Sequence, residues 1–363
     1  MKVKLGDVCD RGSSNLKQSD VINQNGQYPV YGAAGLLGNI DLYHQDKPYV
    51  AVVKDGAGIG RVTLHPGYSS VIGTLQYLLP KENVLPEYLY YVTKHMHLEK
   101  YYTGATIPHI YFKDYKNEKF NLDAIEKQQR IVDILKKTEN IIESRQQELQ
   151  KLDDLIRARF VEMFGDPIEN PKNWEITTVG DIVTEVRYGT SKPAVEGGQY
   201  PYLRMNNLTA DGHLDLRDLK YIDISDEEIE KCVVRTGDVL FNRTNSIDLV
   251  GKTAVFDLSE EMVIAGYIIR VRLKKNMLPE VFSEYMNLKA LKDILRSMAK
   301  GAVNQANINA QELQSIKIYL PDIELQKQFV TIKTQIDKSK ATVQKALDET
   351  QLLFDSLMQK YFG

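Results

Sequence analysis

The sequence has few cysteines and no long apolar segment. Cys9 and Cys232 are its only cysteines, and they lie far apart in the chain. Two such cysteines provide neither a disulfide framework nor zinc-ligand spacing, so we expect a protein of the reducing cytosol. The N-terminus has no apolar core of signal-peptide length, and no apolar run is long enough to span a membrane. These absences predict a cytoplasmic location.

A large charge of one sign is also missing. The formal net charge is −3. Residues 1–122 are slightly basic and residues 166–320 are acidic, but neither segment is a bulk polycation. Any binding to DNA must therefore use a local basic face rather than overall charge.

Sequence patterns of common catalytic sites are absent as well. The chain has no Asn/Asp-Pro-Pro-aromatic motif for methylation of amino groups, no His-Glu-x-x-His and no Gly-x-Ser-x-Gly. Asp55–Gly60 resembles a dinucleotide-binding loop, but it runs into the strand-like Arg61–Leu64 rather than a helix, which favours a hairpin turn. Gly251–Thr253 lacks the glycine that a phosphate-binding loop requires five residues earlier. We expect a non-catalytic chain with no cofactor or metal of its own.

Proline and glycine are absent from two stretches of about 40 residues, 123–163 and 322–362. Aligning Glu126 with Glu324 and Phe164 with Phe362 relates them by a constant offset of 198 residues. Apolar residues recur in them at alternating spacings of four and three, which predicts two coiled-coil helices of roughly 60 Å. The predicted pairing residues are Leu135, Ile142, Leu149, Ile156, Phe329, Ile336, Val343, Leu347 and Phe354. A homodimeric coiled coil is the alternative, but pairing within the chain is favoured because each helix is flanked by its own repeat of a globular unit.

The residues around the helices form a second repeat. Leu5-Gly-Asp-Val8 matches Val179-Gly-Asp-Ile182, and Gly60-Arg-Val62 matches Gly251-Lys-Thr253. The offset between matched motifs grows along the chain, which indicates insertions in the second globular domain. We predict a mixed α/β fold in four parts: a globular domain over 1–122, a helix over 123–165, a second globular domain over 166–320 and a second helix over 321–363.

Short polar stretches carry the side chains best suited to DNA. Arg reads guanine and Asn reads adenine through paired hydrogen bonds in the major groove, and Lys neutralises phosphates. The candidates in the second domain are Arg204, Asn206, Asn207, Asn242, Arg243, Thr244, Asn245, Lys300, Asn304, Gln305 and Asn307. Those in the first domain are Lys54, Arg61, Lys100, Thr106 and His109. The alternative for Arg243 is an ordinary polar turn in which it pairs with Asp238 or Asp248.

Together these features resemble the specificity (S) subunit of a type I restriction–modification enzyme. The duplicated layout, the Asn170-Pro-Lys-Asn-Trp174 entry to the second domain and the run Gly237–Ser246 carry the resemblance. It implies two target-recognition domains separated by two antiparallel helices. Each domain would read one half of a bipartite, asymmetric site in double-stranded DNA, and the helices would set the unread spacer.

The resemblance also implies partners. Two methylation subunits that bind S-adenosylmethionine would clasp the helices, and restriction subunits that use Mg and ATP would join them. The first domain departs from the pattern, because it has Lys54-Asp-Gly-Ala where the second has Asn242-Arg-Thr-Asn. Two other classes stay open: a scaffold that binds only proteins through its helices, and a self-contained DNA-modifying enzyme.

Overall fold

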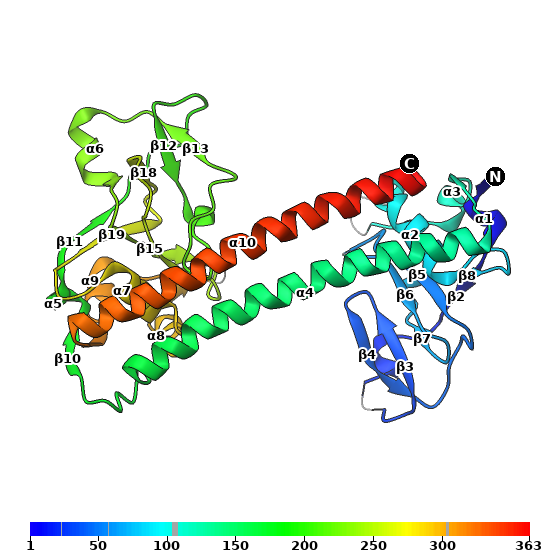
Figure 1. Ribbon diagram of the computed structural model, residues 1–363, viewed down its shortest axis with the longest axis horizontal. Helices are drawn as coiled ribbons and strands as arrows, with labels where there is room; N and C mark the ends of the chain where they lie inside the picture. The colour runs from blue at the N-terminus through cyan, green and yellow to red at the C-terminus, as the bar shows by residue number, and fades with distance from the viewer. Residues whose placement is uncertain (23, 57, 104–107, 303–304) are drawn as a thin grey trace. The chain divides into compact units, whose positions relative to one another are not determined.

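The computed structural model describes the whole chain except residues 23, 57, 104–107 and 303–304 (Figure 1). The described residues form two compact units. Unit 1 comprises Met1–Gln146 together with Gln344–Gly363, and unit 2 comprises Gln147–Val343. Each of the two long helices therefore contributes one half to unit 1 and the other half to unit 2.

Unit 1 contains a four-stranded antiparallel sheet in the order β2-β8-β5-β6, a three-stranded sheet in the order β4-β3-β7 and the pair β1-β9. Its strands are β1 Lys2–Lys4, β2 Cys9–Ser13, β3 Tyr28–Gly32, β4 Gly35–Ile40, β5 Tyr49–Val53, β6 Val62–His65, β7 Ser70–Val71, β8 Leu75–Pro80 and β9 Lys119–Asn121. Its short helices are α1 Leu5–Val8, α2 Pro86–His95 and α3 Phe112–Tyr115, with 3-10 turns at Gln18–Asp20 and Leu98–Tyr101.

Unit 2 contains four-stranded sheets in the orders β11-β19-β15-β17 and β13-β12-β18-β14, the small sheet β16-β21-β20 and the pair β10-β22. Its strands are β10 Glu175–Thr178, β11 Val183–Tyr188, β12 Tyr200–Leu203, β13 Lys220–Ile222, β14 Val233–Val234, β15 Val239–Asn242, β16 Thr244–Asn245, β17 Thr253–Val255, β18 Met262–Ile264, β19 Ile268–Leu273, β20 Lys300–Ala302, β21 Gln305–Asn307 and β22 Lys317–Leu320. Its short helices are α5 Val179–Ile182, α6 Asp226–Cys232, α7 Pro279–Asn287, α8 Lys289–Met298 and α9 Ala310–Gln314, with a 3-10 turn at Met205–Asn207.

The two units share one sheet topology, which confirms the predicted mixed α/β fold and its internal repeat. The order β2-β8-β5-β6 of unit 1 corresponds to β11-β19-β15-β17 of unit 2. The parallel pair β3-β7 likewise corresponds to β12-β18. Strand β5 is buried at all five positions, as a short apolar run covered on both faces should be.

The two 40-residue helices α4 (Ile125–Phe164) and α10 (Ile323–Phe362) pack antiparallel, as expected. In unit 1, Leu135 near the start of α4 shares a hydrophobic core with Phe354 near the end of α10. In unit 2, Phe160 near the end of α4 packs on Phe329 near the start of α10, with ring centroids 5.4 Å apart. The left-handed φ of +88° at Gly165 ends α4.

The predicted seam residues differ in burial. Leu135, Ile156, Phe329, Ile336 and Phe354 are buried, whereas Ile142, Leu149, Val343 and Leu347 are half-buried. Polar contacts occupy the intervening positions: Arg145 Nη1 donates to Ala346 O and Thr350 Oγ1 in unit 1, and Lys340 pairs with Asp153 in unit 2. Arg145 and Lys340 are half-buried in the seam, and each has an oxygen partner because a basic side chain removed from water needs one.

A buried glutamine docks α2 onto the first turn of α4 in unit 1. Gln128 Oε1 accepts a hydrogen bond at 2.9 Å from the backbone N–H of Leu85, the residue that precedes α2. Gln128 Nε2 donates to the backbone carbonyls of Asn83, at 2.9 Å, and Asp123, at 2.8 Å. The side chain is fully buried. One amide thus satisfies a helix N-terminus and two turn carbonyls at once.

Unit 2 repeats this contact 198 residues later. Gln326 Oε1 accepts from Leu278 N at 2.9 Å, immediately before α7. Gln326 Nε2 donates to the carbonyls of Asn276 and Pro321, at 2.9 and 2.8 Å. Gln326 is also fully buried. The helix copies and the globular copies are therefore joined by the same hydrogen bonds.

We predict that Gln128→Ala lowers the free energy of unfolding of unit 1 by about 1–3 kcal/mol, because it leaves buried donors and acceptors without partners. Urea denaturation followed by circular dichroism measures this change. The matched control is Gln129→Ala: Gln129 is the exposed next residue, and its loss should stay within about 0.5 kcal/mol. Equal effects of the two substitutions would show that the buried amide does not dock α2.

Candidate nucleic-acid interface

The loop that follows β15 continues directly from that strand, which is buried. Val239–Phe241 have no exposed surface, and neither does Asn242, the next residue. Asn242 Nδ2 donates to the carbonyls of Thr244 and Tyr267, each at 3.1 Å, and its Oδ1 accepts from Asn245 Nδ2 at 2.8 Å. Both N–H groups of this buried amide and its oxygen are engaged within the protein, so Asn242 positions the loop.

Arg243 is half-buried and has hydrogen-bonding capacity to spare. Its guanidinium lies 4.9 Å from the centre of the Tyr188 ring, and its Nη1 donates to Gly266 O at 3.4 Å. Its Nε is buried and has no hydrogen-bond partner among the described residues. The predicted alternative partner Asp238 pairs with Arg272 instead, at 2.8 Å. A cation held 4.9 Å from the centre of an aromatic ring, with few of its N–H groups engaged by the described residues, suits recognition of an anion or a base.

The two polar stretches predicted separately in unit 2 meet in one small sheet. Thr244 of β16 is the register partner of Asn307 in β21, and Thr244 Oγ1 donates to Asn307 Oδ1 at 3.1 Å. The sheet continues from β21 to β20. Of the other predicted residues, Lys300 lies in β20, Gln305 lies in β21, and Asn304 lies outside the described residues.

The third predicted stretch of unit 2 is mostly engaged within the protein. Arg204 Nη2 pairs with Asp218 Oδ2 at 2.7 Å. Asn207 is buried, with its Oδ1 accepting from Arg204 N and its Nδ2 donating to Asp215 O, each at 2.8 Å. Asn206 is exposed, and of the two asparagines it is the one placed for contact from outside.

Backbone hydrogen bonds fix both ends of the Arg243 loop. Asn242 N donates to Lys252 O, and Gly251 N donates to Asn242 O, both at 2.8 Å. Ile308 N donates to Arg243 O at 2.9 Å. This pattern holds the loop against β17 and against the segment that follows β21.

Unit 1 repeats the same pattern after β5. Val53 N donates to Arg61 O, and Gly60 N donates to Val53 O, both at 2.9 Å. Ile110 N donates to Lys54 O at 2.9 Å. Each unit therefore presents one basic residue directly after its buried central strand.

This match corrects the alignment made from the sequence by one residue. Lys54 corresponds to Arg243 and not to Asn242, whose counterpart is Val53. The sequence alone left this register open because the loop from Lys54 to Gly60 has seven residues and its counterpart from Arg243 to Gly251 has nine.

Side chains on the unit 1 loop also join the two predicted stretches. Asp55 Oδ1 lies 2.6 Å from His109 Nδ1, and the two residues form a β-bridge. The pair corresponds to Thr244 and Asn307 of unit 2. Lys54 Nζ lies 3.7 Å from Asp55 Oδ2, so its charge is shared with a neighbouring carboxylate.

The remaining predicted residues of unit 1 are spread out. Arg61 Nη1 donates to Ala33 O at 2.8 Å. Lys100 pairs with Glu118 Oε1 at 2.5 Å. Thr106 lies outside the described residues.

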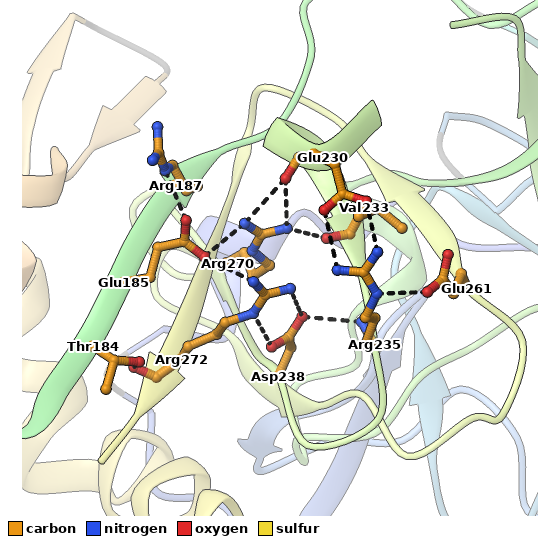
Figure 2. Close-up of polar contacts among 10 residues, drawn as sticks. All are labelled: Thr184, Glu185, Arg187, Glu230, Val233, Arg235, Asp238, Glu261, Arg270 and Arg272. Carbon is orange, nitrogen blue, oxygen red and sulfur yellow. Dashed lines mark hydrogen bonds and ion pairs between the residues drawn. The ribbon is translucent and has the colours of Figure 1, made fainter. Parts of the chain in front are cut away.

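An ion network that the sequence analysis missed supports the sheet carrying β15 (Figure 2). Its charged members are Arg187, Arg235, Arg270, Arg272, Glu185, Glu230, Asp238 and Glu261. Arg270 is fully buried, pairs with Glu185 Oε2 at 2.9 Å and donates to Val233 O. A hydrogen bond to Asp238 raises the pKa of Arg272. Every arginine here has a carboxylate partner, so the network positions strands rather than presenting free positive charge.

Metal-binding and membrane-spanning features are absent from the described residues. No three of their His, Cys, Asp or Glu side chains are grouped so as to hold a metal ion. None of the helices in the described part of the chain has the length and apolar content needed to cross a bilayer.

A family model described as "Type I restriction modification DNA specificity domain" matches residues 1–154 and 171–350. Among similar proteins, the putative type I restriction enzyme MjaX specificity subunit of Methanocaldococcus jannaschii is 32% identical over 199 residues. The type I restriction enzyme EcoKI specificity subunit of Escherichia coli is 28% identical over 189 residues. These alignments cover 53% and 50% of this chain, but the chain spans less than half of each relative, 46% and 40%.

Two solved structures share the fold. The S subunit of a type I restriction–modification system from M. genitalium superposes with a TM-score of 0.60 at 16% identity, covering 100% of this chain and 96% of that one. A chain from a study of complex assembly and conformational transition in the type I system gives a TM-score of 0.55 at 17% identity, covering 99% and 97%.

We predict that Asn242→Ala costs about 1–3 kcal/mol of unfolding free energy, because three hydrogen bonds of a buried amide are lost. The amide protons of Thr244 and Asn245 should also exchange faster, since the loop loses its anchor. Asn206→Ala, at an exposed position of the same unit, is the control and should change stability by less than about 0.5 kcal/mol. Similar stabilities for both variants would contradict the positioning role.

Proposed function

The chain belongs to the type I restriction–modification DNA specificity family, and from this membership we propose that it recognises the DNA sequence on which a type I complex acts. Unit 1 and unit 2 would each read one half of a bipartite, asymmetric site in double-stranded DNA. The observation that carries the proposal is a repeated arrangement, in which a buried strand is followed directly by the basic residue Lys54 or Arg243. Two half-sites of different sequence require two loops that are held in the same way but carry different polar side chains.

Arg243 is the strongest candidate for a base contact. The Tyr188 ring restricts the guanidinium, so less side-chain entropy is lost on binding. Arginine recognises guanine through O6 and N7, and one such bidentate pair contributes about 1–3 kcal/mol of discrimination. Lys54 would act as a point charge at the same position of unit 1. Local charge of this kind is compatible with the net charge of −3.

The two helices would set the number of unread bases between the half-sites, because each helix belongs to both units. In this proposal the chain contributes sequence recognition and no bond-breaking chemistry. Methylation subunits that bind S-adenosylmethionine and restriction subunits that use Mg and ATP would supply the reactions.

An apolar strip on the helices suits the docking of a methylation subunit. Within unit 1, Ile134 and Ile141 are 41% and 46% exposed, and Leu352 and Leu353 are 72% and 52% exposed. Ile134, Ile141 and Leu353 each precede a seam residue by one position, so in an antiparallel pair they lie along one edge. Exposed apolar side chains in such a row mark a surface that another helix covers.

The DNA proposal is tested at the two basic residues. Mapping of modified adenines in DNA from cells that express the chain with its partner subunits first identifies the site. We then expect Arg243→Ala to weaken binding to that site by about 1–3 kcal/mol and to relax one position of one half-site. Lys54→Ala should weaken cognate and scrambled DNA alike and lower the salt slope by about one.

The controls are Lys275→Ala and Lys81→Ala, which remove exposed lysines beyond the opposite ends of the sheets that carry β15 and β5. They should leave DNA affinity unchanged. Unchanged affinity for Arg243→Ala and Lys54→Ala would remove both loops from the interface. A complex that assembles with its partner subunits and binds no DNA would favour the protein-binding scaffold.

The docking face is tested by the double variant Ile134→Glu with Ile141→Glu. Charges placed on a covered apolar strip should reduce affinity for the methylation subunit by at least about tenfold, equivalent to 1.4 kcal/mol. Size-exclusion chromatography and calorimetry measure assembly. The control exchanges the exposed neighbours Lys137 and Glu148 for Ala and should assemble normally. Normal assembly of the Glu variant would place the partner elsewhere.

A further inference from the structure

A groove of about 680 Å³ opens in unit 1 between α2, α4 and α10. Its apolar lining includes Leu64, Val132, Ile142 and Phe354. This volume lies within the range of sites that hold ligands or short segments. All of the lining residues belong to unit 1, so the groove is a property of that unit alone.

The rim of the groove is acidic. Its charged residues are Glu87, Glu139, Glu143 and Asp355 against Lys94 and Lys136, a net charge of −2. Lys94 Nζ is already paired with Glu139 Oε1 at 2.9 Å, and Tyr91 OH donates to Glu139 Oε2 at 2.6 Å. A rim with this balance of charge attracts a basic group.

The corresponding groove of unit 2 is occupied by the protein itself. Because α2 and α7 begin alike after Leu85 and Leu278, Tyr90 and Lys94 of unit 1 correspond to Ser283 and Asn287 of unit 2. A turn formed by residues 209–213 lies on these two positions. Gly212 sits so close that an added Cβ would lie 2.7 Å from Asn287 Nδ2 and 3.6 Å from Ser283 Oγ.

Charge complementarity holds this turn in place. Asp211 Oδ2 lies 3.5 Å from Lys340 Nζ, and His213 Nε2 lies 3.4 Å from the same ammonium. Lys340 corresponds to Ile142 of unit 1 at the helix offset of 198. The turn of unit 2 thus contacts a lysine that is shared with Asp153, whereas unit 1 has the apolar Ile142 at this position, below an acidic rim.

The difference between the units has a simple origin. In unit 1, β3 and β4 are joined by residues 33–34 alone. In unit 2, the corresponding strands β12 and β13 are joined by residues 204–219, which include the turn that fills the groove. Unit 1 therefore has the groove but lacks the inserted turn that fills the corresponding groove of unit 2.

We propose that the groove of unit 1 binds a tight, basic turn of a methylation subunit, which takes the place that residues 209–213 take in unit 2. The inference rests on the proposed function for the identity of the partner. The close approach of Gly212 to α7 indicates that the occupant is a polypeptide turn with a small residue against the helix. A second copy of this chain does not fit, because its own turn would bring Asp211 to a rim of net charge −2.

The asymmetry has a functional meaning within this proposal. Two identical methylation subunits that dock on the helix pair would meet one open groove and one closed groove. The subunit beside unit 1 would gain a contact that the other lacks, so the two would bind with unequal affinity.

The test is site-specific photocrosslinking in the complex reconstituted from purified methylation subunits. A benzophenone amino acid replaces Asn140, an exposed residue of the groove lining. The matched control carries the same group at Lys338, the exposed equivalent of Asn140 in unit 2. We expect Asn140 to crosslink to a basic segment of the methylation subunit with a yield about tenfold above that at Lys338.

A charge reversal supplies the second readout. Glu143→Lys with Asp355→Lys changes the net charge of the groove from −2 to +2 and should lower the Asn140 crosslink about tenfold. Glu169→Lys with Glu175→Lys makes the same change in net charge at exposed positions of unit 2 and should leave the yield unchanged.

The outcomes separate this inference from the proposed function. An assembled complex with no crosslink at Asn140, with equal yields at Asn140 and Lys338, or with a crosslink to a second copy of the chain overturns the inference and leaves the function standing. Failure of the unmodified chain to assemble, scored by size-exclusion chromatography, overturns both.

Discussion

A buried amide at the first turn of each long helix is the constraint on which the rest of the fold depends. Gln128 and Gln326 are fully buried, and each bonds one backbone N–H and two backbone carbonyls. An unmet buried group would cost about 1–3 kcal/mol, so the start of α2 or α7 must stay in register with its long helix. The contact keeps the same position in both helix copies, whereas the sheets differ in loop length.

In unit 2, the residues that hold the strands and the loop in place are different from Arg243, the residue available for contact with DNA. The ion network of Figure 2 links β11, β15 and β19 to α6, and its arginines are neutralised by carboxylates. Asn242 uses its whole side chain to shape the turn. Against this fixed background Arg243 keeps a buried Nε without a partner among the described residues. A neutral, rigid support allows one cation to be placed accurately without adding nonspecific charge.

Much of the fold followed from local sequence rules, and the site followed only in part. Uninterrupted helix formers with alternating spacing identified α4 and α10, and the internal repeat pointed to their pairing within the chain. The same spacing placed Leu149 and Leu347 in the seam, yet neither is fully buried, because burial depends on which neighbours a helix meets. Asn242 and Asn206 look equally suited to bind a base, but Asn242 is buried at the end of β15 and Asn206 is exposed in a 3-10 turn. Tyr188 lies 55 residues before Arg243, so no local pattern could reveal that contact.

The division of the two helices between the units sets an order for folding during synthesis. The core of unit 1 includes Ile131 and Leu135 from α4 and also Phe354 and Met358 from α10. Between these pairs the ribosome must add the whole of unit 2, roughly 200 residues, which takes about 10–40 s at usual rates of elongation. Unit 1 is therefore begun first and completed last. For that interval the part of the α4 surface that packs on Phe354 and Met358 has no intramolecular cover, although α2 and the sheet can already pack on the rest.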